Sequence, residues 1–447
     1  MKKLLPALLT AFFALPAAHA VQLLAVGSLD AKRGDLSAAT AAPLENGVAG
    51  NSLGGLGSGL AYAGGNTFIA VPDRGPNAIA YNPLVDHTNS YIARFHTLSM
   101  SMTANASGSG LPFKLTPTLT ATTLLSSPTS LAYGSGALGT GNGHTLGSGI
   151  PALNDAGHNY FTGRSDNFDP AKPSSNPNNG RLDMEAVRVA NDGKSIFVSD
   201  EYGPYVYQFD RASGSRIASY VLPANLAVRV QSASGHAEIA ANASGRIANK
   251  GMEGLALTPD GKTLVGIMQA NLEQDNKKVL RIVSIDLATK ATHEYAYQLS
   301  GGKGVSEIVA LNDHQFLVDE RDGKGLGDNS EAVVKQLFMV DLNGASDVSD
   351  AIRLTADSPA LNKSLFLDLV AVLKANGYNA SQIPSKIEGL AFGADVTVNG
   401  VRTHTLYVSN DNDFLVGDNQ FFVFGVNDAD LAKIGASYTP QAISASP

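Results

Sequence analysis

The stretch of sequence that decides the fold is MEGLALTPDGKTLVGI, residues 252–267. Two short runs of apolar and β-forming residues flank a turn of proline, aspartate, glycine and lysine. Such turns between β-forming runs are typical of hairpins, because aspartate and glycine accept the backbone conformations that tight turns need. The stretch therefore predicts a β-hairpin whose first strand opens next to an acidic residue, Glu253.

Four other parts of the chain repeat this layout of a short apolar strand, a turn or loop, and a second strand that ends in polar residues. The copies span residues 58–75, 184–201, 306–321 and 387–411. Further β-forming segments follow most of the hairpins, and a hairpin with two more strands makes one four-stranded blade. The sequence therefore predicts an all-β fold, a single β-propeller with five recognisable blades, with a sixth blade possible between residues 113 and 180.

Each end of the chain beyond the repeats carries one more β-forming segment, residues 22–27 and residues 421–426. We expect these segments to pair and close the ring, because pairing removes the exposed edges of an open sheet. The expected loop insertions lie at about 101–112, 134–180, 224–250 and 355–386. Apolar residues recur with helical spacing in the last of them, which predicts a short helix near residues 360–376.

The first 20 residues have the layout of a secretory signal peptide. Lys2 and Lys3 precede an apolar run from Leu4 to Leu15, and the small-residue site Ala18-His19-Ala20 follows it. The apolar run is too short for a permanent membrane span. We therefore expect a signal peptide at residues 1–20, one propeller domain at residues 21–447, no membrane anchor, and export to the periplasm or the medium.

The composition excludes several classes of function. The chain has 32 basic and 40 acidic residues, and loss of Lys2 and Lys3 would bring its net charge from −8 to about −10. An acidic balance argues against binding of nucleic acid through its phosphates. The absence of cysteine excludes disulfides and thiol nucleophiles. The nine histidines include no H-E-x-x-H motif, so a zinc site is not expected.

Carboxylates recur at two places in the repeats, the start of the first strand and the end of the second. These two places share one rim, because the strands of a hairpin are antiparallel. The strand starts contribute Glu185, Glu253, Glu307 and Glu388, and the strand ends contribute Asp200, Glu201, Asp319 and Glu320. Crowded like charges are costly without cations, and carboxylate oxygens suit Ca²⁺. These residues are the predicted metal ligands.

Basic residues accompany the same rim, either shortly before a glutamate or at the end of a second strand. They are Arg74, Arg181, Lys250, Arg321 and Lys386. Their side chains could neutralise the carboxylates or bind phosphate oxygens beside a metal ion. The repeat at residues 58–75 departs from the pattern, because we expect Gly59 to stand where the others have glutamate.

A structural interpretation of the acidic pattern stays open. A glutamate at a strand start can accept hydrogen bonds from the neighbouring blade and so hold two blades together. A repeat copies such a structural device as readily as it copies a binding site. The pattern alone therefore does not separate the two interpretations.

Four segments, residues 181–209, 249–269, 306–324 and 386–414, resemble the phytase-like family described as having esterase-like activity. The most diagnostic motifs are MEAV (184–187), SDEYGP (199–204), GMEGL (251–255) and IEGLAF (387–392). The resemblance covers about residues 56–426 and implies an exported propeller that hydrolyses phosphate or carboxylic esters. The histidine-phosphatase motif R-H-G-x-R-x-P is absent. The resemblance therefore implies metal-assisted hydrolysis, as in the propeller phytases that use calcium.

The predicted function is an exported, metal-dependent hydrolase of small phosphate esters or other esters, with Ca²⁺ as the hypothesised cofactor and no residue assigned as catalytic. The alternative is a non-catalytic exported propeller that binds a ligand or a partner protein through the same face. Replacing the glutamates by glutamine separates these possibilities, because an enzyme loses turnover whereas a structural device loses stability.

Overall fold

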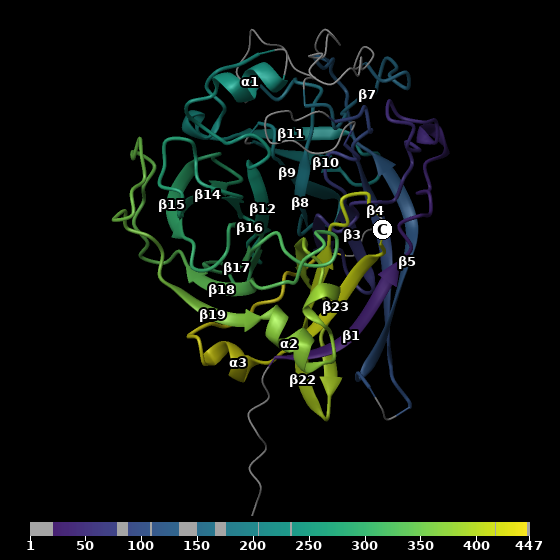
Figure 1. Cartoon of the computed structure of the whole chain (residues 1–447), viewed down its shortest axis with the longest axis vertical. Helices are drawn as coiled ribbons and strands as arrows, with labels where there is room; N and C mark the ends of the chain where they lie inside the picture. The colour runs from purple at the N-terminus through teal and green to yellow at the C-terminus, as the bar shows by residue number, and fades with distance from the viewer. Residues whose placement is uncertain are drawn as a thin grey trace, which may run out of the picture.

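The computed structural model describes residues 21–77, 88–107, 110–133, 150–165, 176–203, 205–232, 235–415 and 417–444. The predicted signal peptide and much of the predicted insertion at 134–180 lie outside these residues. Within them, five sheets are arranged around a ring as the blades of a β-propeller (Figure 1). The prediction of an all-β propeller with five blades is confirmed.

Four of the blades are consecutive along the chain, and all neighbouring strands within them are antiparallel. The first contains β2 (Gly59–Tyr62), β3 (Thr67–Val71), β4 (Arg94–Ala104) and β5 (Phe113–Leu124). The second contains β8 (Met184–Val189), β9 (Ser195–Asp200), β10 (Tyr205–Asp210) and β11 (Arg216–Val221). The third contains β12 (Met252–Leu257), β13 (Thr263–Met268), β14 (Val279–Asp286) and β15 (Thr292–Gln298). The fourth contains β16 (Gly304–Ala310), β17 (Gln315–Arg321), β18 (Lys335–Asp341) and β19 (Lys363–Asp368).

The fifth blade joins the two ends of the chain. It contains β20 (Ile387–Phe392), β22 (Val401–Asn410), β23 (Asn419–Val426) and β1 (Gln22–Leu29), with β21 (Val396–Val398) paired to β22. The register of β1 against β23 runs from Gln22 opposite Gly425 to Leu29 opposite Asn419. The predicted closure of the ring is therefore confirmed. Between β5 and β8 the described residues form only the short pair β6 (Ser126–Ser127) and β7 (Asn159–Tyr160), not a sixth blade.

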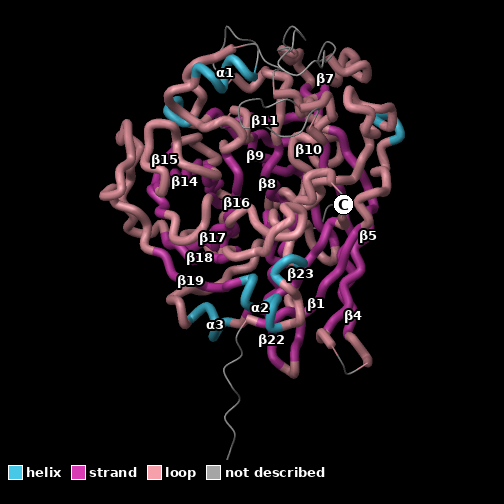
Figure 2. Tube along the Cα trace, viewed as in Figure 1, coloured by secondary structure: helices cyan, strands magenta, loops and turns pink. Residues whose placement is uncertain are grey.

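Helices are short and lie at the periphery of the ring (Figure 2). They are α1 (Gly235–Ala241), α2 (Leu369–Ala375), α3 (Asp428–Ala432), and 3-10 turns at Ala38–Thr40, Ala224–Leu226 and Ala380–Gln382. Among the described residues, no helix has the length and apolar character that a membrane crossing requires.

The helix predicted near residues 360–376 is present only in its second half. Residues 363–368 form β19, because the leucines there also alternate with the period of a strand and pair with β18. Asp368 then caps the N-terminus of α2, and its side chain accepts a hydrogen bond from the backbone N–H of Ala371 at 2.9 Å.

The inner strands β2, β8, β12, β16 and β20 contact one another in turn, and β20 contacts β2 to complete the circle. Apolar side chains pack between neighbouring blades, for example Ile69 against Val187 and Phe68 against Tyr407. Strands β8, β12 and β20 are buried along their whole length. Burial on both faces explains why the inner strands read as nearly continuous apolar runs. The charged residues at their starts are therefore the exceptions that need explanation.

Candidate functional site

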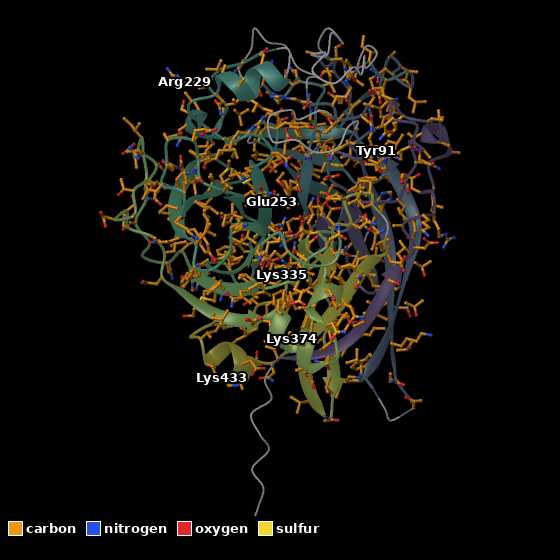
Figure 3. All side chains as sticks on the ribbon, viewed as in Figure 1. Tyr91, Arg229, Glu253, Lys335, Lys374 and Lys433 are labelled. Atoms are coloured by element: carbon orange, nitrogen blue, oxygen red, sulfur yellow. The ribbon has the colours of Figure 1, made fainter. Side chains whose placement is uncertain are left out.

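A cavity of about 850 Å³ lies at the end of the ring where the inner strands begin. Its lining includes the carboxylates Asp73, Glu185, Glu201, Glu253, Glu388 and Asp413 and the bases Arg74, Lys250, Arg321 and Lys386. The other lining residues are Asn46, Val48, Pro76, Asn77, Asn249, Gln269, Gly323, Phe414 and Leu415. Glu253 is labelled on its inner strand near the middle of the ring in Figure 3. The cavity thus collects charged side chains from the strands, or the loops beside them, of all five blades.

Three glutamates reach this cavity because the inner strands bulge where they begin. In the second, third and fifth blades, the register between the first two strands shifts next to Glu185, Glu253 and Glu388 respectively. A bulge inserts an extra residue, bends the strand and redirects the side chain. The bulges therefore place these three predicted ligands on the cavity wall.

In the fourth blade the bulge lies one residue before the glutamate instead of at it. Its register shift lies between Val305 and Glu307, so Ser306 is the extra residue and Glu307 lies opposite Asp319. Ser306 accepts a hydrogen bond from the guanidinium of Arg321. The expectation of four equivalent glutamates on one rim is therefore wrong for this blade, because the bulge moves Glu307 one position deeper into the channel.

Glu307 is fully buried and contacts one guanidinium group and two backbone N–H groups. Its Oε2 lies 2.9 Å from Nη2 of Arg188, and its Oε1 accepts from the backbone N–H groups of Leu255 at 3.0 Å and Ile308 at 2.9 Å. Arg188 also donates to the carbonyl of Leu60 at 2.8 Å. These contacts join four different blades across the channel. Burial raises the pKa of Glu307 to about 7, and Arg188 opposes that rise.

The first blade contributes a hydroxyl where the sequence predicted only a glycine. The Oγ of Ser58 lies 3.1 Å from Oε2 of Glu388 and 3.3 Å from Oε2 of Glu185. Ser58 thus occupies the place that the other blades give to glutamate or to Ser306. A Cβ on Gly59 would lie 2.9 Å from the Cα of Ala186, so Gly59 serves the close approach of neighbouring inner strands instead.

Asp183 is a buried member of the site that the sequence pattern did not reveal. Ligand oxygens of Asp183, Glu185 and Glu201 all lie within 4.8 Å of one another. Arg74 pairs with Asp183 at 3.0 Å. The available signal was its position two residues before Glu185, which places both on the same side of an extended chain. The other repeats carry no acid at this position, so comparison of the repeats did not select it.

A second acidic group lies at the fifth-blade side of the cavity. Carboxylate oxygens of Asp73, Asp411 and Asp413 lie within 4.8 Å of one another. Lys386 pairs with Asp411 at 2.9 Å and also contacts Asp413. Burial would lower the pKa of Lys386, but the two aspartates outweigh burial and raise it well above its usual value. The ammonium group of Lys386 therefore already balances part of the negative charge of this group.

The bases of the lining differ in how they are engaged. Arg321 pairs with Glu388 at 2.6 Å and lies 3.7 Å from Glu253. Lys250 lines the cavity and, within the described part of the chain, its ammonium group has no ion pair or hydrogen bond. Lys250 is therefore the base best placed to meet an incoming anion.

Four other predicted site residues do not line the cavity. Asp200 accepts from the backbone N–H groups of Asp183 and Tyr202. Glu320 accepts from two loop N–H groups and pairs with Lys363 at 2.6 Å. Arg181 donates to a backbone carbonyl at 2.6 Å and lies 3.6 Å from Glu238. Asp319 is fully buried, and neither of its carboxylate oxygens has a hydrogen-bond partner within the described chain.

The cavity carboxylates carry strongly shifted pKa values. Burial, followed by the charge of Glu388, raises the pKa of Glu253 to about 8. Burial and the charge of Glu253 raise the pKa values of Glu185 and Glu201 well above the usual range. The Oε2 atom of Glu253 is buried without a hydrogen-bond partner in the described residues. An oxygen-only donor set with an unsatisfied oxygen fits a hard divalent cation, so the buried acidic clusters could bind a metal ion.

Backbone strain also gathers at the cavity. Asn249, Asp413 and Phe414 line it and have φ angles of 54°, 54° and 55°. Residues other than glycine seldom adopt this left-handed conformation, and strained backbone concentrates at functional sites.

Comparison with known proteins agrees with a phytase-like assignment. A family model described as phytase-like, esterase-like activity of phytase, matches residues 51–414. An uncharacterized secreted protein of Arthroderma benhamiae is 34% identical over 140 residues, which cover 27% of this chain and 27% of that protein. The match therefore spans only about a quarter of that relative's length.

Two solved structures illustrate the likeness to other proteins. Hydrazine synthase of Kuenenia stuttgartiensis is 9% identical, with 80% of this chain and 78% of that chain covered and a TM-score of 0.34. The Cps50 (Swd1) β-propeller domain of Myceliophteria thermophila is 11% identical, with 50% and 49% covered and a TM-score of 0.24. At these TM-scores neither likeness carries an argument about this chain.

Proposed function

The chain belongs to the phytase-like family, whose description is esterase-like activity of phytase. From that premise we propose that it is an exported, metal-dependent hydrolase of phosphate esters or other esters. The family suggests activity of the esterase or phosphatase type. The observation that carries the proposal is the cavity at the strand starts, where buried carboxylates lie beside a base without an ion pair.

A divalent cation would be held by Asp183, Glu185 and Glu201, with Glu253 beside them. Calcium suits this set, because every donor is an oxygen and the negative charge is high. When bound, the ion would supply positive charge that offsets the phosphoryl oxygens and polarises the bond under attack.

The protein's own residues would do the remaining work. Lys250 and Arg321 would bind and orient phosphate oxygens, as charge-assisted donors do at anion sites. Glu253 lies beside the proposed metal ligands and would accept a proton from an attacking water. The raised pKa values of Glu185 and Glu201 mean that a cation would compete with protons for these oxygens.

The test is hydrolysis of 4-nitrophenyl phosphate by the purified protein, after treatment with EDTA and after return of calcium. We expect chelation to lower turnover at least about 100-fold and calcium to restore it. Glu201→Gln should weaken the restoration, whereas Glu331→Gln, which changes an exposed glutamate outside the lining, should behave as wild type. Turnover that survives chelation would contradict the metal requirement. Calcium binding without turnover of any ester would favour the non-catalytic binding propeller.

A further inference from the structure

One side of the cavity is apolar. Phe414 and Leu415, on the loop between β22 and β23, line it together with Val48 and Pro76. The side chain of Leu415 is 58% exposed, and it shares a small depression of about 30 Å³ with Leu326, which is 46% exposed. An exposed leucine that lines a charged cavity, with a second exposed leucine in the adjoining depression, is an apolar surface that a ligand could cover.

The backbone of this apolar side has a strained conformation. Asp413 and Phe414 are consecutive residues with φ angles of 54° and 55°. A left-handed conformation is uncommon for a bulky residue and costs stability, so it persists only where surrounding contacts enforce it.

Neighbouring residues pack closely around Phe414. A Cβ on Gly54 would lie 2.5 Å from the Cα of Phe414, and a Cβ on Gly55 would lie 2.6 Å from its Cε2. The ring of Tyr91 meets the phenyl ring edge-on, with centroids 5.4 Å apart. The Asn412 side chain accepts the N–H of Gly55 at 2.7 Å, which ties the loop to the glycines. The position of Phe414 is therefore specified by its neighbours.

The charges of the cavity limit what it can bind besides an apolar group. Six carboxylates and four bases line it. Arg74, Arg321 and Lys386 already pair with carboxylates, which leaves Lys250 as the base without an ion pair among the described lining residues. In the metal-free cavity a ligand with several phosphates would meet more negative than positive charge, whereas one phosphate can be met by the ammonium group of Lys250.

We infer, resting on the proposed function, that the apolar side formed by Phe414 and Leu415 binds the hydrocarbon part of the substrate. The substrate class is then a phosphate monoester of an apolar alcohol or phenol, with its phosphate towards Lys250 and its hydrocarbon part against the loop between β22 and β23.

The test is a series of n-alkyl phosphates, methyl, butyl and hexyl, whose leaving groups have nearly the same chemistry. Buried methylene groups strengthen binding, so kcat/KM should rise about tenfold or more from methyl to hexyl phosphate in the presence of calcium. Binding of hexylphosphonate against methylphosphonate, measured by calorimetry, gives a second readout that needs no turnover and should show the same preference.

The variant Leu415→Ser should remove much of the advantage of the hexyl compounds in both measurements. Leu36→Ser is the matched control, because Leu36 is 57% exposed but does not line the cavity. Turnover with no preference for the longer chains would overturn this inference while the proposed function stands. A hexyl preference in binding without any turnover would support this inference and contradict the proposed hydrolase.

Discussion

In the third blade Glu253 is the extra residue of a bulge and lines the cavity, whereas in the fourth blade Glu307 lies one position deeper and pairs with Arg188. Each glutamate stands at the start of the inner strand of its own repeat. A shift of one residue in strand register redirects a side chain, so one glutamate faces the cavity and the other joins neighbouring blades. Repeated acidic positions in a propeller can therefore have separate roles.

The largest expected effect is on folding, from Glu307→Ala. The substitution leaves Arg188 buried without its carboxylate, and breaking a buried ion pair from one side costs about 3–5 kcal/mol. Urea unfolding should show this loss of free energy. The double substitution Arg188→Met with Glu307→Leu should recover part of it, because no unpaired charge remains. A Glu307→Ala protein as stable as wild type would show that this pair does not hold the blades together.

The matching substitution in the third blade, Glu253→Gln, should act on turnover instead. Loss of a carboxylate that accepts a proton should lower kcat about 100-fold. The free energy of unfolding should be unchanged or higher above pH 8, since the charge of Glu253 there opposes that of Glu388. Steady-state kinetics and urea unfolding on one preparation test both parts. A large loss of stability with normal turnover would assign Glu253 the structural role instead.

The metal-free protein should be more stable at low pH than at high pH. Burial raises the pKa values of Glu253 and Asp319 to about 8 from ordinary values near 4.5 and 3.8. Between those values the folded protein keeps protons that the unfolded chain releases, so stability falls as pH rises towards and through 8. Melting temperatures measured in EDTA from pH 5 to 9 should show this decline.

Calcium should reduce this fall in melting temperature with rising pH, because a cation can replace protons on the cavity carboxylates. It cannot replace the proton on Asp319, because Asp319 does not line the cavity. Asp319→Asn should make the decline shallower both with and without calcium, whereas Glu253→Gln should do so mainly in EDTA. A melting temperature that does not depend on pH between 5 and 9 would contradict the raised pKa values.

The smallest effect is expected at Ser58. Ser58→Ala removes one hydroxyl that contacts Glu185 and Glu388, and such hydrogen bonds contribute about 0.5–1.5 kcal/mol. Turnover should fall less than tenfold, because a carboxylate that accepts protons or binds metal is retained. A loss as large as that of Glu253→Gln would mean that Ser58 itself takes part in the chemistry.

The fold was predictable because its signals are local and repeated. The turn at Asp260 and Gly261 and the apolar strand before it mark a hairpin, and five copies mark the blades. The pairing of β1 with β23 followed from two segments that otherwise lacked partners. The helix at the end of the fourth blade was predicted too long, because residues 363–368 fit both a helical and a strand pattern and pairing with β18 decides between them.

The site was predictable only in part, because its members depend on bulges and on contacts between blades. Glu185, Glu253 and Glu388 were found from the repeat. Ser58 and Ser306 were missed, since their equivalence to glutamate appears only in the strand register. Asp183 and Phe414 have no counterpart in the other repeats, so the comparison of repeats contained no signal for them.

The measurement that tests the central claim most directly is anomalous diffraction from crystals soaked in calcium. The account predicts a peak in the cavity at coordination distance, about 2.3–2.6 Å, from carboxylate oxygens of Asp183, Glu185 and Glu201. No peak in the cavity at saturating calcium, with Arg321 still beside Glu253 and Glu388, would contradict the proposal that these carboxylates hold a metal ion.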